Sequence, residues 1–319
     1  MDKTTIVVTH STSFSLASKV KDYFILIKFT LSFLVVFSCV VSYLLAPNVS
    51  YNFYSILLLF VGGMLITGSA NAINQTVEKD TDILMKRTAG RPVAAGRMSV
   101  KEGWTFSIIT GAVGLIILWQ YFNLESALVG LFSWFLYGFI YTPLKKVNSI
   151  SVIVGAIPGA LPCLIGWIAG TGLINPFAEI TGVLANGEVH TFSNSGGYIL
   201  FLIQFIWQFP HFWAIAWLAH KDYTNAGFKL LPSTDGPTKF SAIQAVIYSM
   251  IMVPVGMLPY YFNISGMLAF WVLLFCNLWM VYASVMLLVK MNAGAARKVM
   301  FSSYFYLMIV FLVLLFDKL

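Results

Sequence analysis

Nine long apolar stretches follow one another along the chain and constrain its fold more than any other feature. A transmembrane helix needs about 20 mostly apolar residues to cross a bilayer. The predicted spans are residues 22–45, 52–73, 103–121, 126–142, 150–170, 197–219, 241–262, 265–289 and 299–316. Only 10% of the residues are charged, whereas a soluble domain carries about 25%. We therefore predict an all-α integral membrane protein, a bundle of nine transmembrane helices.

Basic residues alternate with these spans. Lys and Arg occur before the first span and after the second, fourth, sixth and eighth, and the loops after the odd-numbered spans up to the seventh contain none. Lys28, near the start of the first span, and Lys318, at the C-terminus, are the two exceptions. Cytoplasmic loops are enriched in Lys and Arg. We expect a multi-pass protein of the cell's inner (cytoplasmic) membrane, with a cytoplasmic N-terminus and an extracytoplasmic C-terminus.

The same pattern defines the expected domain organisation. Residues 1–21 would be a cytoplasmic N-terminal tail, residues 22–316 a single transmembrane domain, and residues 171–197 a solvated extracytoplasmic loop rich in Gly, Asn and Thr. The net charge of +7 could suggest nucleic acid as a partner. Because the positive charges follow the membrane topology, we expect the lipid bilayer instead and no nucleic acid.

A dense acidic and basic segment, NQTVEKDTDILMKRTAGRP, occupies residues 74–92. Asn74, Glu78 and Asp82 recur every four residues, so they share one helix face if the second span continues past the membrane boundary. An amide and two carboxylates provide the oxygen ligands that Mg²⁺ prefers. Three cations follow that could neutralise a diphosphate: Lys86, Arg87 and Arg91.

A solvated helix end would explain the same residues differently. Glu78–Lys79 and Asp82–Lys86 would then be ordinary surface ion pairs. The strict spacing of the oxygen ligands and the adjoining RTAGRP sequence favour a metal-bound diphosphate.

A second polar group follows the sixth span, within WQFPHFWAIAWLAHKDYTNAGFKLLP, residues 207–232. His211 and Asp222 are 11 residues apart, about three helical turns, so they would share a face. Pro210 would kink the helix or begin a new segment. Polar groups within a span are costly and are therefore functional candidates. The topology puts this group, the residue 74–92 segment and the YTPLKK sequence at 141–146 on one membrane face.

Each of these residues has a structural alternative. His211 could be a packed histidine bonded to neighbouring backbone, and Asp222 could form a boundary ion pair with Lys221. The aromatic residues of the segment could line a pocket or form an interfacial aromatic belt.

These motifs resemble those of a known family. The pattern NxxxExxxD within residues 74–92 is similar to the first motif of the UbiA intramembrane prenyltransferases, most of which have Asp in the middle position. Glu78 there, followed by MKRTAGRP, resembles the protoheme IX farnesyltransferase (haem O synthase) branch. The 207–232 segment is similar to the second motif of that branch, and YTPLKK with the Gly- and Pro-rich helix after it also fits. The resemblance covers roughly residues 20–316 but not the tail or the 171–197 loop.

The resemblance implies a nine-helix UbiA bundle in which cytoplasmic motif loops cap a central cavity. It implies transfer of a farnesyl group from farnesyl diphosphate to a vinyl group of haem b, with addition of water, giving haem O. A haem A synthase or a terminal oxidase assembly would receive the product.

The resemblance also implies roles for individual residues. The catalytic and Mg²⁺-binding residues would be Asn74, Glu78, Asp82 and Asp222. The diphosphate-binding residues would be Lys86, Arg87, Arg91, Lys145, Lys146 and Lys221. The acceptor-binding residues would be Gln208, His211, Trp213 and Tyr141.

Two other functions stay open on the sequence alone. Another UbiA enzyme would prenylate a quinone precursor or a chlorophyll-type acceptor. A transporter of an anionic or lipid-linked substrate would have its site near the bilayer midplane, whereas the charges of this chain gather on one face.

Overall fold

The computed structural model describes residues 15–183, 188–231 and 236–319. The helices are α1 (Leu16–Leu26), α2 (Phe29–Leu45), α3 (Phe53–Val77), α4 (Lys79–Asp82), α5 (Val100–Tyr121), α6 (Leu124–Phe135), a π-helical turn (Leu136–Tyr141), α7 (Thr142–Leu144), α8 (Ser151–Thr171), α9 (Gly196–Leu218), α10 (His220–Asn225), α11 (Lys239–Tyr261), α12 (Met267–Lys290) and α13 (Ala293–Phe316). The two strands are β1 (Glu179–Val183) and β2 (Val189–Ser193).

The chain is a multi-pass membrane protein. Eight helices of the described residues are long and apolar enough to cross a membrane, and the bent pair α1 and α2 makes a ninth if it is counted as one span. Large apolar side chains such as Ile108, Trp271, Phe275 and Val289 are more than half exposed. An apolar surface of this extent needs lipid around it. The predicted nine-span helical bundle is confirmed.

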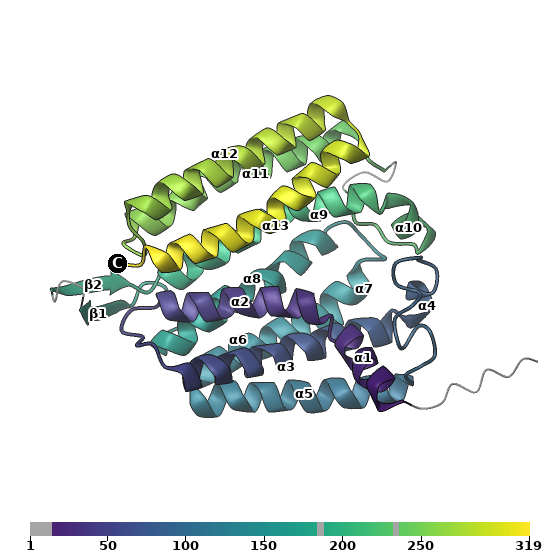
Figure 1. The fold of residues 1–319 in the computed structure, drawn as a ribbon, viewed down its shortest axis with the longest axis horizontal. Coiled ribbons are helices and arrows are strands. Elements are labelled where there is room, and N and C mark those ends of the chain that lie inside the picture. The colour runs from purple at the N-terminus through teal and green to yellow at the C-terminus, as the bar shows by residue number, and fades with distance from the viewer. Residues whose placement is uncertain (1–14, 184–187, 232–235) are drawn as a thin grey trace, which may run out of the picture.

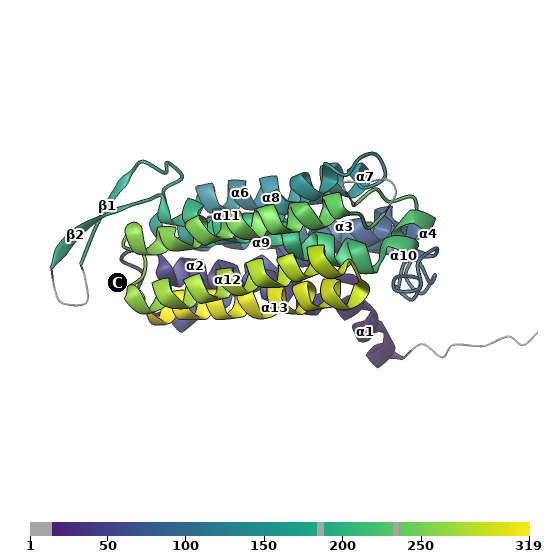
Figure 2. The same ribbon diagram turned by 90° about the horizontal axis from the view of Figure 1, so that it is seen from above.

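The long helices run side by side along one axis (Figures 1 and 2). α8 and α9 are the most buried spans. α8 packs against α2, α6 and α9, while α9 packs against α11 and α13. The short helices α4, α7 and α10 lie together at one end, which we call the motif end, and the strands and C-terminus lie at the other.

The first span is broken rather than continuous, which corrects the predicted helix over 22–45. α1 begins at Leu16, inside the predicted tail, and meets α2 at an angle of 52°. Lys28 lies at the break with a left-handed backbone (φ 49°). The Gln75 side-chain amide donates to the carbonyl oxygens of Ile25 and Leu26 at 2.8 and 2.9 Å. These bonds satisfy carbonyl groups that the break leaves without helical partners. Residues 1–14 of the predicted tail lie outside the described residues.

Ion pairs hold α1 against the chain that follows the first motif. Lys19 Nζ lies 2.7 Å from Glu102 Oε1, and the Arg97 guanidinium donates to both oxygens of Asp22. The two pairs fix the direction of α1 and therefore the position of the break.

The 171–197 connection, predicted as a solvated loop, contains two paired antiparallel strands. Thr181 lies opposite Thr191 in the register. β-Branched and aromatic residues favour strands, and both strands contain them. The Asn48 amide donates to the carbonyl oxygen of Thr181 at 2.7 Å, and Trp167 Nε1 donates to Asn194 Oδ1 at 2.9 Å. The connection is therefore anchored to the end of the bundle.

The contact between α8 and α2 leaves no room for a side chain at Gly166. A Cβ there would overlap the carbonyl oxygen of Cys39, a backbone atom. We expect Gly166→Ala to lower the thermal unfolding midpoint of the detergent-purified protein, because overpacking costs about 1–3 kcal/mol. Gly90→Ala is the control, since nothing lies within 4 Å of a Cβ at that position. Equal midpoints for the two variants would contradict this close packing.

Candidate active site at the motif end

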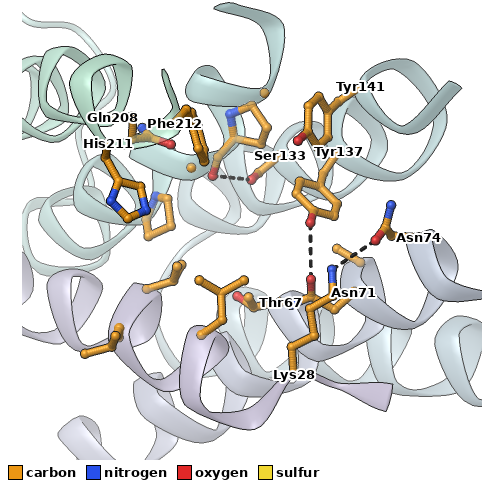
Figure 3. Close-up of a pocket in the computed structure, with 18 of the residues that line it drawn as sticks. Lys28, Thr67, Asn71, Asn74, Ser133, Tyr137, Tyr141, Gln208, His211 and Phe212 are labelled. Atoms are coloured by element: carbon orange, nitrogen blue, oxygen red, sulfur yellow. Dashed lines mark hydrogen bonds between the residues drawn. The ribbon is translucent and has the colours of Figure 1, made fainter. Parts of the chain in front are cut away.

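A cavity of about 590 Å³ lies within the bundle and is lined by the motif-end segments as well as by the spans. Its polar lining lies near the motif end and includes Asn74, Glu78 and Asp82, while Leu59, Leu118 and Ile165 line its apolar part. In Figure 3, Gln208 and His211 lie across the cavity from Lys28 and Asn71. The volume is within the range of small-molecule sites.

The first motif keeps its predicted shared face although α3 ends at Val77. The amide of Glu78 donates to the carbonyl oxygen of Asn74 at 3.0 Å, and the amide of Asp82 to that of Glu78 at 2.8 Å. These bonds repeat the helical i to i−4 spacing. All three side chains line the cavity and are buried, with exposed fractions of 1% for Asn74, 4% for Glu78 and 0% for Asp82. The alternative of a solvated helix end is wrong.

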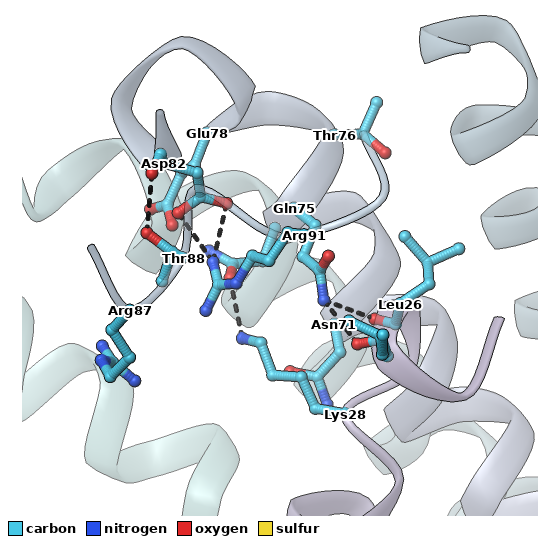
Figure 4. Close-up of polar contacts among 12 residues, drawn as sticks. Leu26, Lys28, Asn71, Gln75, Thr76, Glu78, Asp82, Arg87, Thr88 and Arg91 are labelled. Atoms are coloured by element: carbon cyan, nitrogen blue, oxygen red, sulfur yellow. Dashed lines mark hydrogen bonds and ion pairs between the residues drawn. The ribbon is translucent and has the colours of Figure 1, made fainter. Parts of the chain in front are cut away.

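Each buried carboxylate has one cationic partner from further along the chain. Arg91 Nη1 donates to both oxygens of Asp82, at 2.8 and 2.7 Å, as Figure 4 shows. Glu78 forms an ion pair with Lys145. The alternative of surface ion pairs predicted Lys79 and Lys86 as the partners of Glu78 and Asp82. This prediction is wrong for both carboxylates.

Burial changes the proton affinity of this group. It raises the pKa of the Asp82 carboxyl, although Arg91 opposes the change. It lowers the pKa of Lys145, and Glu78 opposes that change.

Lys28 is a site residue that the sequence analysis did not assign. The break between α1 and α2 points its side chain into the cavity, where Nζ donates to Asn74 Oδ1 at 2.9 Å (Figure 3). Burying a charged lysine within an apolar span costs free energy, so such a residue is a functional candidate by default. Its position outside the basic loops was therefore the signal that could have identified it.

The π-helical turn directs two tyrosines into the cavity. Such turns add one residue to a helical turn and are frequent at functional sites. Tyr137 donates to Asn71 Oδ1 at 3.2 Å, and Tyr141 lines the same wall, as predicted for an acceptor-binding residue. Thr142 Oγ1 accepts from the Asn74 amide at 3.2 Å. The turn therefore orients the first motif as well.

Beyond α9, the second motif contributes Tyr223 and Phe228 to the cavity lining, but not Asp222. Arg87 Nη2 donates to the Tyr223 hydroxyl at 3.2 Å, and the Phe228 ring centroid lies 5.2 Å from Lys145 Nζ. His211 lines the cavity and Asp222 does not, although helical bonds continue across the junction of α9 and α10, so the two predicted site residues do not meet in this wall. Five predicted site residues lie outside the cavity lining in this structure: Asp222, Lys86, Lys146, Lys221 and Trp213.

The predicted acceptor side is a neutral wall on α9. Gln208 and His211 both line the cavity, and the Gln208 amide donates to the carbonyl oxygen of Ala156 at 2.9 Å. Trp213 is buried and packs on Phe209 instead. α9 continues through Pro210, so no new segment begins there.

Asn74, Glu78 and Asp82 are the residues of the cavity whose chemistry fits a magnesium ion. Among the described residues, no group of three or more His, Cys, Asp or Glu side chains could hold a metal. Two carboxylates and an amide nevertheless suit Mg²⁺, which takes its remaining oxygen ligands from water and substrate phosphate.

The model of the UbiA prenyltransferase family matches residues 35–311. This chain belongs to the UbiA prenyltransferase family. A UbiA relative from Cytophaga hutchinsonii, named protoheme IX farnesyltransferase, is 40% identical over 95% of this chain and 99% of its own length. A relative of the same name from Christiangramia forsetii is 38% identical over 97% of this chain and 96% of its own. The family resemblance is confirmed.

Solved UbiA-type structures share the fold. A digeranylgeranylglyceryl phosphate synthase structure has a TM-score of 0.73 at 20% identity and covers 94% of this chain and 98% of its own. A UbiA homologue from Archaeoglobus fulgidus, bound to GPP and Mg²⁺, has a TM-score of 0.60 at 18% identity and covers 92% of this chain and 99% of its own.

The buried Asp82–Arg91 pair makes a prediction about stability. Arg91→Gln leaves the Asp82 carboxylate buried without its counter-ion, a change that costs about 3–5 kcal/mol. We expect a large fall in the thermal midpoint of the ligand-free protein, and a partial recovery when Asp82→Asn is added. Lys79→Gln is the control, because both side chains of the Lys79–Asp80 pair are exposed, at 44% and 84%. Equal losses from Arg91→Gln and Lys79→Gln would argue against the special role of the buried pair.

Proposed function

We propose that this protein transfers a farnesyl group from farnesyl diphosphate to a vinyl group of haem b, and that water is added to give haem O. The observation that supports a prenyl diphosphate is the group of two buried carboxylates, one buried amide and four cations that line one cavity. The names of the relatives support haem as the acceptor. The apolar part of the cavity suits a farnesyl chain.

Asn74, Glu78 and Asp82 would hold Mg²⁺ against the diphosphate, and bound Mg²⁺ would supply neutralisation of its charge. Without a ligand, Arg91 and Lys145 serve as counter-ions of the two carboxylates. Carboxylates that ligate a metal no longer need those partners. Arg91 and Lys145 would then be free to bond the diphosphate oxygens.

Lys28 and Arg87 add two further cations to the cavity lining. Positive groups placed where charge develops are often the largest catalytic contribution. These residues would stabilise the diphosphate as the farnesyl C1–O bond breaks and the electron pair leaves with the diphosphate. The terminal vinyl carbon of haem would bond to C1, leaving a cation on the carbon beside the porphyrin. Water would add there and lose a proton. The apolar walls would keep other water molecules from the allylic cation.

The remaining predicted residues lie at the motif end but outside the cavity lining. Asp222 would assist the metal, and Trp213 the acceptor, only after local movement. The same holds for the exposed cations of the diphosphate group, which are Lys86, Lys146 and Lys221.

We further propose that the protein lies in the inner membrane with its N-terminus and motif end in the cytoplasm and the two strands outside. The alternation of basic loops supports this orientation. Residues 22–316 would act as one domain. Haem O would pass to a haem A synthase or a terminal oxidase assembly.

The deciding measurement is mass spectrometry of the haems in membranes given farnesyl diphosphate, haem b and Mg²⁺. We expect haem O, and none after chelation of the metal. Glu78→Gln and Asp82→Asn should each lower the rate by roughly 10²–10³, the loss seen for a single electrostatic contact to a developing charge.

Asp80→Asn is the matched control for these variants, because the Asp80 side chain is 84% exposed and should leave the rate unchanged. A quinone precursor offered beside haem tests the rival acceptor. Prenylation of that competitor alone would refute the haem assignment, and full activity of both carboxylate variants would refute the metal site.

The pH dependence of kcat/KM reports groups of the free protein. Burial raises the pKa of Asp82 and lowers that of Lys145. As the pH falls, Asp82 is therefore protonated at a higher pH than an ordinary aspartate. As the pH rises, Lys145 loses its proton at a lower pH than an ordinary lysine. We expect a bell narrowed on both sides when Mg²⁺ is kept below saturation, because a bound cation would itself favour the ionised form of Asp82.

Lys145→Arg separates the two limbs of this bell, because arginine is not deprotonated in proteins. We expect the alkaline limb to move to higher pH while the acid limb stays. An unmoved alkaline limb would exclude Lys145 as its origin.

A further inference from the structure

His211 has a defined proton position in this structure. Its Nδ1 lies 2.7 Å from Ser303 Oγ, and Ser303 Oγ donates to the carbonyl oxygen of Met300 at 2.6 Å. A serine hydroxyl has a single proton. Since that proton is given to Met300, Nδ1 must be the donor in the His211–Ser303 bond. Nε2 of the neutral ring therefore keeps its lone pair.

Neighbouring side chains fix the orientation of this ring. Trp207 stacks on His211 with ring centroids 5.0 Å apart and an interplanar angle of 15°. Trp207 Nε1 also donates to the carbonyl oxygen of Ser303 at 2.8 Å. Tyr304 meets the imidazole edge-on, with centroids 5.0 Å apart. Ser303, on α13, therefore forms a hydrogen bond with each of the two stacked rings.

The free nitrogen belongs to the cavity wall. His211 lines the cavity and is only 8% exposed. Among the described residues, the side-chain hydrogen bond of His211 is made through Nδ1, and Nε2 makes none. A histidine that binds a metal through one nitrogen almost always donates its other N–H to a neighbouring acceptor, which sets its tautomer and direction. The His211–Ser303–Met300 chain has this form.

We propose that His211 Nε2 is the axial ligand of the acceptor's iron and that Ser303 is the residue that positions it. The inference rests on the proposed function, since haem is the acceptor there. Coordination would set the distance of the porphyrin from α9. Rotation of the porphyrin about the bond from Nε2 to iron would then decide which vinyl group faces the farnesyl C1.

The test compares two porphyrins on the full-length protein in detergent, without farnesyl diphosphate. Ferric haem b and iron-free protoporphyrin IX are titrated, and the Soret band and the electron paramagnetic resonance of the iron are recorded. We expect histidine-ligated iron in the wild type, and an affinity for haem that exceeds that for protoporphyrin by more than the roughly 10–100-fold that loss of an outer-shell partner costs. His211→Gly should lose both features, and added imidazole should restore the ligated spectrum.

Ser303→Ala should weaken haem binding about 10–100-fold and leave protoporphyrin binding unchanged, while Ser303→Thr, which keeps the hydroxyl, should retain the wild-type spectrum. Ser284→Ala is the matched control, because it removes a buried hydroxyl bonded to Ser249 at 2.8 Å and lies outside the cavity lining. Its spectrum and affinities should be those of the wild type.

Two results would overturn the inference while leaving the proposed function in place. One is a wild-type iron spectrum in His211→Gly. The other is an equal loss of both porphyrins in that variant, which would make His211 a packing residue. Haem O production by the wild type is assayed in parallel. If neither porphyrin bound and no haem O formed, the acceptor itself would be wrong.

Discussion

Charge burial at the motif end is the constraint on which the rest of the site depends. A carboxylate removed from water is costly unless it is paired, and Glu78 and Asp82 are almost fully buried. Their partners, Lys145 and Arg91, come from two different segments. The Glu78–Lys145 pair joins the end of α3 to the chain after α7. Satisfying two buried charges therefore brings separate motifs into one wall.

Stability alone does not explain such pairs. Replacing a buried ion pair by apolar residues is often neutral or stabilising, and the surrounding bundle is apolar enough to have used that solution. A function that needs the charges does explain them. The carboxylates and their counter-ions are already desolvated, so a metal-bound diphosphate would exchange partners with them rather than strip water from each group. Little reorganisation would then be left for the moment of reaction.

Features that depend on local periodicity could be predicted from the sequence. Apolar length determines the spans, and the four-residue spacing brings Asn74, Glu78 and Asp82 onto one face because the helical bonds continue past Val77. It could not predict which cations pair with them, because those contacts are tertiary. The left-handed backbone at Lys28 could not be predicted either, because the position is not a glycine, the residue that usually adopts this conformation. The spacing argument did not bring Asp222 into the cavity lining beside His211, because tertiary packing decides which part of a helix end faces a cavity.

The two walls of the cavity differ in charge, and this difference bears on the chemistry. The wall formed by the first motif and Lys145 is ionic, whereas Gln208 and His211 bond only to neutral groups. An allylic cation reacts with any exposed lone pair, and the unpartnered Nε2 of His211 would compete with the vinyl carbon for farnesyl C1. Iron coordination would occupy that lone pair. The same contact that holds the acceptor would thus remove the strongest competing nucleophile from this wall, so the farnesyl cation would meet an imidazole only when haem is absent.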